Sequence, residues 1–140
     1  MDENTYFQER LEGEIAWYER KSSINKRNYY LVRLIEFLSA ALIPFLINFL
    51  SNNTEMLKLA VEVLGIIVVI STSVISLFRF QELWTEYRTN AESLKHEKYL
   101  YLSSAPPYDT PDKFKTLVER VERLISSENS RWQEFTSARS

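Results

Sequence analysis

Cysteine is absent from this chain of 140 residues, which has only two glycines and one histidine. Without cysteine there is no disulfide, no thiolate nucleophile and no cysteine-based metal site. The two glycines, Gly13 and Gly65, leave little room for β-turns or for a phosphate-binding loop. Positive charge is not in excess either, because 17 Lys and Arg stand against 19 Asp and Glu. The length and composition predict one all-α domain that does not bind nucleic acid.

The residue types that carry catalysis are also scarce or poorly spaced. His96, the single histidine, lies among charged neighbours, as a solvated surface histidine does. Glu92 and Glu97 are five residues apart in a predicted helix, so their carboxylates point in different directions. The sequence contains no nucleophile elbow, no Walker motif and no dinucleotide fingerprint. We therefore expect no enzymatic activity, no cofactor and no metal site.

Two apolar runs without charge, Phe37–Leu50 and Val63–Phe78, occupy the middle of the chain. A membrane-spanning helix needs about 20 mostly apolar residues. Each run reaches this length when it is taken from Ile35 or from Leu59 onward, which brings in Glu36 or Glu62. We interpret residues 34–50 and 59–78 as two membrane-spanning helices that form a hairpin. A soluble four-helix bundle is an alternative, but a soluble helix normally shows a polar face at every turn.

Two features of the hairpin follow from single residues. Pro44 removes one backbone hydrogen bond within the first span and should kink it. Ser51–Thr54 is read as the hairpin loop, with Thr54 as the N-cap of the second helix.

Helices with one apolar stripe flank the two spans. The predicted segments are an N-terminal helix over 1–33, a stalk helix over 79–104 that continues the second span, and a C-terminal helix over 111–136. The proline-rich stretch around Pro106 and Pro107 ends the stalk, and Thr110 with Pro111 should start the last helix. The stripes comprise Phe7, Leu11, Ile15, Tyr18, Ser22, Asn25, Tyr29 and Val32; Phe80, Trp84, Tyr87, Ala91, Leu94, Lys98 and Tyr101; and Phe114, Leu117, Val118, Val121, Leu124 and Ile125, extended by Trp132 and Phe135.

Basic residues near the ends of the spans predict the orientation. They precede the first span and follow the second, whereas the connecting loop region holds only Lys58. Because cytoplasmic segments carry the excess of Lys and Arg, both termini should be cytoplasmic. The flanking bundle is then a cytoplasmic helical bundle.

Two groups of side chains are candidates for function. Glu36, Glu62, Thr72 and Ser76 lie in the spans, where carboxylates are costly and usually face protein or a water-filled path. They are candidate pore or gate residues. The alternatives are that Glu36 pairs with Arg33, that Glu62 pairs with Lys58, or that the hydroxyls serve helix packing. The candidate assembly residues, all in the stalk, are Trp84, Tyr87, Arg88 and Glu92; the alternatives are internal packing and an ordinary Arg88–Glu92 pair.

The stalk also carries a family resemblance. The residues are Trp84-x-x-Tyr87-Arg88, then Glu92-x-Leu94-Lys95-x-Glu97, then Leu100 with Pro107-Tyr108. This pattern resembles a bacterial two-transmembrane family of unknown function related to the SLATT (SMODS/SLOG-associating two-transmembrane effector) family. The resemblance implies a multi-pass protein of the bacterial inner membrane, proposed to act as a pore-forming effector in conflict systems. It also implies a cytosolic sensor protein as a partner, and it carries over no catalytic residue.

Because two spans cannot enclose an aqueous path, conduction would require self-assembly. The leading expectation is a homo-oligomeric pore or ion channel of about four or more subunits in a lipid bilayer. The alternative is a membrane-anchored helical interaction module that conducts nothing.

Overall fold

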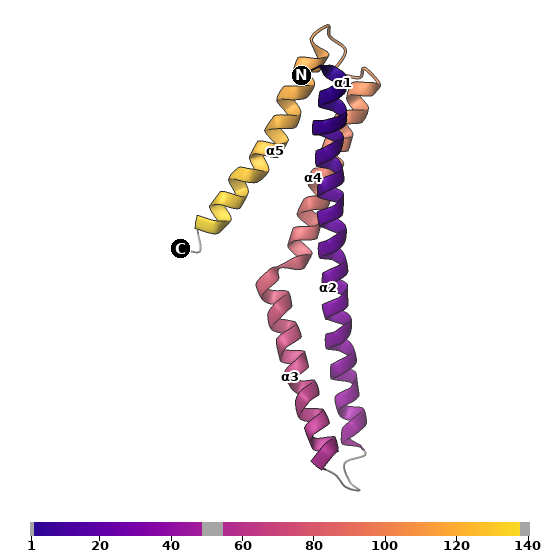
Figure 1. Cartoon of the computed structure of the whole chain (residues 1–140), viewed down its shortest axis with the longest axis vertical. Coiled ribbons are helices and arrows are strands. Elements are labelled where there is room, and N and C mark those ends of the chain that lie inside the picture. Colours follow the sequence, from indigo (N-terminus) through magenta and orange to yellow (C-terminus); the bar gives the residue numbers. More distant parts are fainter. Residues whose placement is uncertain (1, 49–54, 138–140) are drawn as a thin grey trace. The chain divides into compact units, whose positions relative to one another are not determined.

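The computed structural model describes residues 2–48 and 55–137, with the side chains of residues 129 and 132–137 outside the description (Figure 1). The described residues are almost entirely helical and contain no strand, which confirms the all-α class. The predicted hairpin loop Ser51–Thr54 and the side chains of Trp132 and Phe135 lie outside the described residues. In chain order the elements are α1 (Glu3–Thr5), the π-helix η1 (Tyr6–Leu11), α2 (Glu12–Ile47), α3 (Glu55–Phe78), α4 (Phe80–Leu102) and α5 (Lys113–Ser137).

The chain divides into two compact units, which are described separately below. Unit 1 comprises Met1–Lys21 and Glu86–Ser140, and unit 2 comprises Ser22–Thr85. The long helices α2 and α4 each contribute residues to both units.

The core of unit 1 consists of the stripes that the sequence predicts. Side chains from η1, the start of α2, α4 and the first half of α5 are buried, so apolar stripes at helical spacing account for most of the core. Tyr108, in the connection between α4 and α5, is also fully buried and lies outside the predicted stripes. The buried apolar residues of the stripes are Leu11, Ile15 and Tyr18; Tyr87, Ala91, Leu94 and Tyr101; and Leu117, Val121 and Ile125.

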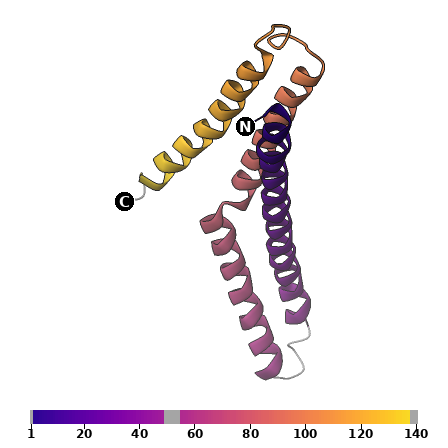
Figure 2. The same cartoon turned by 45° about the horizontal axis from the view of Figure 1, so that its top comes forward.

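Unit 2 contains α3 and the C-terminal part of α2, which run side by side (Figure 2). Two helical stretches, Glu3–Ile47 and Glu55–Leu102, each contain a segment long and apolar enough to cross a membrane. Only 6% of each segment is buried inside the protein. The large side chains Phe37 and Leu77 accordingly remain 64% and 67% exposed.

The second span and the stalk do not form the continuous helix that the sequence predicts. Arg79 separates α3 from α4 and adopts a left-handed conformation with φ of 47°. Arg79 itself keeps backbone hydrogen bonds on both sides of the break, because its amide donates to Ile75 at 3.2 Å and its carbonyl accepts from Leu83 at 3.1 Å. The break also lets the rings of Phe78 and Phe80 stack at 5.6 Å and 9°. Residues two apart in a regular helix point to different sides, so the stacking depends on the break.

Two further predictions concern the start of the last helix and a kink in the first span. Helix α5 begins at Lys113, so Thr110 and Pro111 lie in the preceding turn, where the Lys113 amide donates to the Thr110 carbonyl at 3.2 Å. Pro44 lies inside α2, which continues to Ile47. The kink at Pro44 stays a prediction.

Candidate functional site

Glu36 connects the two apolar helices of unit 2. The Thr72 hydroxyl on α3 donates to one of its carboxylate oxygens at 2.8 Å, and Arg33 binds the other at 2.8 Å. The Glu36 side chain is 14% exposed. The pair with Arg33 is one of the alternatives that the sequence suggested. The bond to Thr72 could not be predicted from the sequence, because it depends on which faces of the two helices lie together. Glu36 is therefore largely satisfied within its own chain.

Glu62 and Ser76, the other candidate pore residues, are exposed on α3. Lys58 pairs with Glu55 at 3.8 Å, and no ion pair joins it to Glu62 within the described ranges. The structure therefore brings Glu36 and Thr72 together and leaves Glu62 outside that cluster. Ser39 on α2 and Ser71 on α3 are buried, as expected where small residues let two apolar helices approach closely.

The aromatic stalk residues pack inside the chain. In unit 2, the backbone carbonyl of Trp84 accepts from the Ser22 hydroxyl at 2.9 Å, and the Lys26 ammonium lies 5.7 Å from the Trp84 ring. In unit 1, Tyr87 is buried and its ring meets Trp17 edge to face at 5.7 Å. These contacts match the packing alternative, and assembly roles for the two aromatics stay predictions.

Arg88 and Glu92 do not form the pair that the sequence left open. Arg88 is exposed, and Glu92 pairs with Lys95 at 3.4 Å. Lys95 also binds Glu19 on α2 at 2.5 Å. An Arg that precedes Glu by four residues is the weaker order for a helical pair, which is consistent with the choice of Lys95.

Among the described residues of unit 1, four tyrosine–carboxylate hydrogen bonds connect parts of the chain that lie in different elements, and the sequence predicted none of them. A buried tyrosine usually finds a partner for its hydroxyl, so a position on an apolar stripe is the one signal available for Tyr18 and Tyr101. Tyr6 and Tyr108 lie outside the predicted stripes and lack even this signal. The acceptor lies on another element, which helical spacing does not reveal. The four bonds run from Tyr6 to Glu122, from Tyr18 to Glu128, from Tyr101 to Glu3 and from Tyr108 to Glu97.

Two of these carboxylates also hold an arginine. Arg120 binds both oxygens of Glu97, at 2.8 and 2.7 Å, and Arg10 binds both oxygens of Glu122 at 3.0 Å. The hydrogen bonds from Arg120 hold the pKa of Glu97 below its ordinary value, and those from Arg10 lower the pKa of Glu122. Burial, together with the neighbouring Glu3, raises the pKa of Tyr101 to about 12. Helix α5 is thus attached to the rest of unit 1 by charged hydrogen bonds as well as by its apolar stripe.

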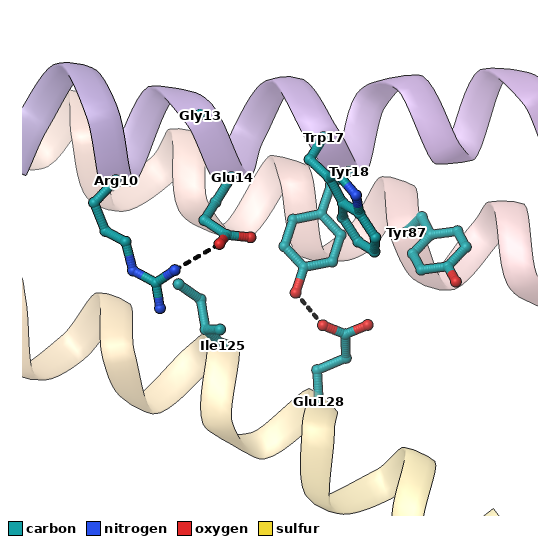
Figure 3. Close-up of a pocket in the computed structure, with 8 residues that line it drawn as sticks. All are labelled: Arg10, Gly13, Glu14, Trp17, Tyr18, Tyr87, Ile125 and Glu128. Carbon is teal, nitrogen blue, oxygen red and sulfur yellow. Dashed lines mark hydrogen bonds and ion pairs between the residues drawn. The ribbon is translucent and has the colours of Figure 1, made fainter.

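An open cavity of about 510 Å³ lies within unit 1 (Figure 3). One wall is aromatic, formed by Trp17, Tyr18 and Tyr87. Polar side chains line the rest: Arg10 binds Glu14 at 2.7 Å, and the Tyr18 hydroxyl donates to Glu128. The lining residues come from η1, α2, α4 and α5, and they are Arg10, Gly13, Glu14, Trp17, Tyr18, Tyr87, Ile125 and Glu128.

These features define a class of all-α protein in which two helices are long and apolar enough to cross a membrane. The family model described as a protein of unknown function (DUF4231) matches residues 14–115, and the chain belongs to this family. No curated protein and no solved structure matches the chain.

Proposed function

We propose that this protein is a two-span integral membrane protein that assembles into a homo-oligomeric pore or ion channel. The observation that carries the proposal is the exposure of large apolar side chains along α2 and α3. Phe45 is 60% exposed and Val69 is 66% exposed, although both lie in segments of spanning length. Exposed apolar surface costs about 25 cal/mol per Å² in water, and a bilayer removes that cost.

Charge supplies the proposed orientation in the membrane. Arg20, Lys21, Lys26, Arg27 and Arg33 precede the first span, and basic residues from Arg79 onward follow the second. The excess of Lys and Arg on these two sides favours cytoplasmic N- and C-termini in a bacterial inner membrane. Unit 1 would then be cytoplasmic.

Glycine and exposed polar groups on α3 support self-assembly. A Cβ atom added at Gly65 would meet nothing within 4 Å, so packing within the chain does not account for a glycine inside this helix. Small residues at such positions let helices of neighbouring subunits approach closely in a bilayer. In an assembly, the exposed Glu62 and Ser76 would be available to a shared path. The resemblance to SLATT proteins adds a role as a bacterial effector that acts with a cytosolic sensor.

A second candidate function is a membrane-anchored interaction module without conduction. The contacts of Glu36 favour it, because Arg33 and Thr72 of the same chain already bind both carboxylate oxygens. Such a carboxylate stabilises a hairpin without lining a path.

Native mass spectrometry in mild detergent, followed by potassium flux from liposomes, tests the proposal. Wild type should form a closed oligomer and release potassium. Gly65→Leu should yield monomers and lose flux, whereas the matched control Gly65→Ala should retain both, because alanine still permits close helix approach. A monomeric wild type would overturn the pore. An oligomer without flux would favour the interaction module.

A further inference from the structure

The cavity of unit 1 combines an aromatic wall with carboxylates. Trp17, Tyr18 and Tyr87 form the wall, with Trp17 edge to face against both tyrosines at 5.0 and 5.7 Å. Glu128 on α5 faces this wall, and Glu14 lies beside it on α2, one turn before Tyr18 (Figure 3). The volume of about 510 Å³ lies within the range of small-molecule sites. We propose that this cavity binds a small organic cation, an ammonium group carried on a short alkyl chain.

The charges around the cavity favour a cation over an anion. Among the described residues that line the cavity, Arg10 is the one that carries a positive charge, and it donates to Glu14 at 2.7 Å and to Glu122 through two further hydrogen bonds at 3.0 Å. Glu14 and Glu128 line the cavity, and Glu122 accepts from the lining Arg10, so three carboxylates stand against this guanidinium. With the Lys21 ammonium beside the Trp17 ring also counted, the carboxylates still outnumber the cationic groups. An anion would have to compete with Glu14 and Glu122 for Arg10.

Two further observations point the same way. The pKa of the Tyr18 hydroxyl is raised, first by burial and then by the neighbouring Glu128 and Glu14, so the cavity disfavours added negative charge. The Lys21 ammonium lies 5.7 Å from the centre of the Trp17 ring, so this indole already accepts a cation on one face. Aromatic faces attract ammonium groups most strongly where water is partly excluded.

Gly13 is the lining residue that has no side chain. A glycine inside a helix costs about 1 kcal/mol relative to alanine, so it usually has a packing reason. Here a Cβ atom would meet nothing within 4 Å, and no neighbour requires the glycine. The residue lines the cavity just after the π-helical turn Tyr6–Leu11, a feature that is frequent at functional sites. A missing side chain at this point leaves room for a ligand.

Calorimetric titration of the full chain in detergent micelles tests the proposal, with spermidine and choline as separate probes. At least one should bind saturably, and its affinity should fall as salt rises, because ions screen the charged contact. The two arms distinguish a primary amine on a chain from a compact quaternary ammonium. The neutral 1,8-octanediol and the dianion adipate should bind more weakly than the bound cation. Equal binding of the diol, tighter binding of adipate, or no binding of either cation would overturn the proposal.

Matched variants locate the site. Glu14→Gln keeps the side-chain size and should weaken cation binding by about tenfold, whereas Glu119→Gln, which removes an exposed charge on α5, should leave it unchanged. Gly13→Leu should fill the cavity and abolish binding, with Ala16→Leu, an exposed position on the same helix, as the control. Circular dichroism checks that each variant keeps its helicity. If Gly13→Leu loses helicity, Glu14→Gln alone decides, and unchanged affinity there would overturn the assignment. The site lies within unit 1, so its test is independent of conduction.

Discussion

Glu97 is a buried carboxylate of unit 1 that accepts hydrogen bonds from Tyr108 and from two guanidinium nitrogens of Arg120. It is only 6% exposed. Arg120→Ala would leave this charge without its main partner and should lower the free energy of unfolding by about 2–3 kcal/mol. Tyr108→Phe removes one hydrogen bond and should cost about 1 kcal/mol. Denaturant unfolding in detergent measures both, with Lys115→Ala at an exposed position as control. An Arg120→Ala variant as stable as the control would contradict this role for the pair.

The same carboxylates predict how stability depends on pH. The pKa values of Glu97 and Glu122 are held below the ordinary value of 4.5 by hydrogen bonds from Arg120 and Arg10. Their contribution is fully present above that ordinary value, and it is lost as pH falls through the lowered pKa values of the folded protein. The melting temperature should therefore fall on acidification from about pH 6 to about pH 3. The Glu97→Gln variant should show a shallower fall, and an unchanged slope would contradict the assignment to Glu97.

At the scale of elements, the break between α3 and α4 can be tested with two substitutions of Arg79. Which of the two variants is the more stable depends on whether the helix is broken there. Arg79 has φ of 47°, a conformation that glycine adopts freely and that costs other residues about 1 kcal/mol. Arg79→Gly and Arg79→Ala both remove the charge and the ion pair with Glu82. With the break in place, the glycine variant should be the more stable by about 1 kcal/mol. A continuous helix would reverse the order, because alanine is the better helix former. Thermal unfolding of the two variants distinguishes the cases.

The elements also show what the sequence could predict. The stripe formed by Leu11, Ile15 and Tyr18 follows from helical spacing alone, so most of the core of unit 1 was predictable, apart from Tyr6 and Tyr108. The break at Arg79 was not predictable from the sequence. The contact that favours it, the stacking of Phe78 on Phe80, forms only when the helix is broken. The start of α5 at Lys113 differs from the predicted Pro111 by two residues, as helix ends often do.

The candidate sites were less predictable than the stripes, because their partners lie far apart in the chain. Spacing suggests Arg33 as a partner for Glu36, since the two are one helical turn apart. The second partner, Thr72, is 36 residues away and lies on the facing helix. Tyr18 and Glu128 are separated by 110 residues. Neither pairing has a local signal, so both required the tertiary arrangement.

At the scale of the whole molecule, the proposed orientation can be tested by labelling. The native chain has no cysteine, so single cysteines at Asn53 and Ser130 are unambiguous reporters. An impermeant thiol reagent added outside intact spheroplasts should modify Asn53→Cys and spare Ser130→Cys, because the basic flanks favour the cytoplasm. Permeabilised spheroplasts serve as the control, in which both cysteines should react. The opposite pattern would reverse the orientation, and modification of both in intact spheroplasts would exclude the hairpin.

Conduction by the assembled protein should depend unequally on its two span carboxylates. Glu62 is exposed on α3, so in an oligomer it is available to form a ring of charge that concentrates cations at one mouth of a pore. Glu36 is only 14% exposed and is bound by Arg33 and Thr72, so its charge is already compensated. Glu62→Gln should therefore reduce the preference for cations, measured as the reversal potential across a planar bilayer under a salt gradient. Glu36→Gln should change selectivity much less and should mainly weaken the hairpin.

Native mass spectrometry of both variants separates a change in selectivity from a loss of assembly. A larger selectivity change in Glu36→Gln, with the oligomer intact, would place the path on the α2 side of the hairpin and contradict the assignment to Glu62.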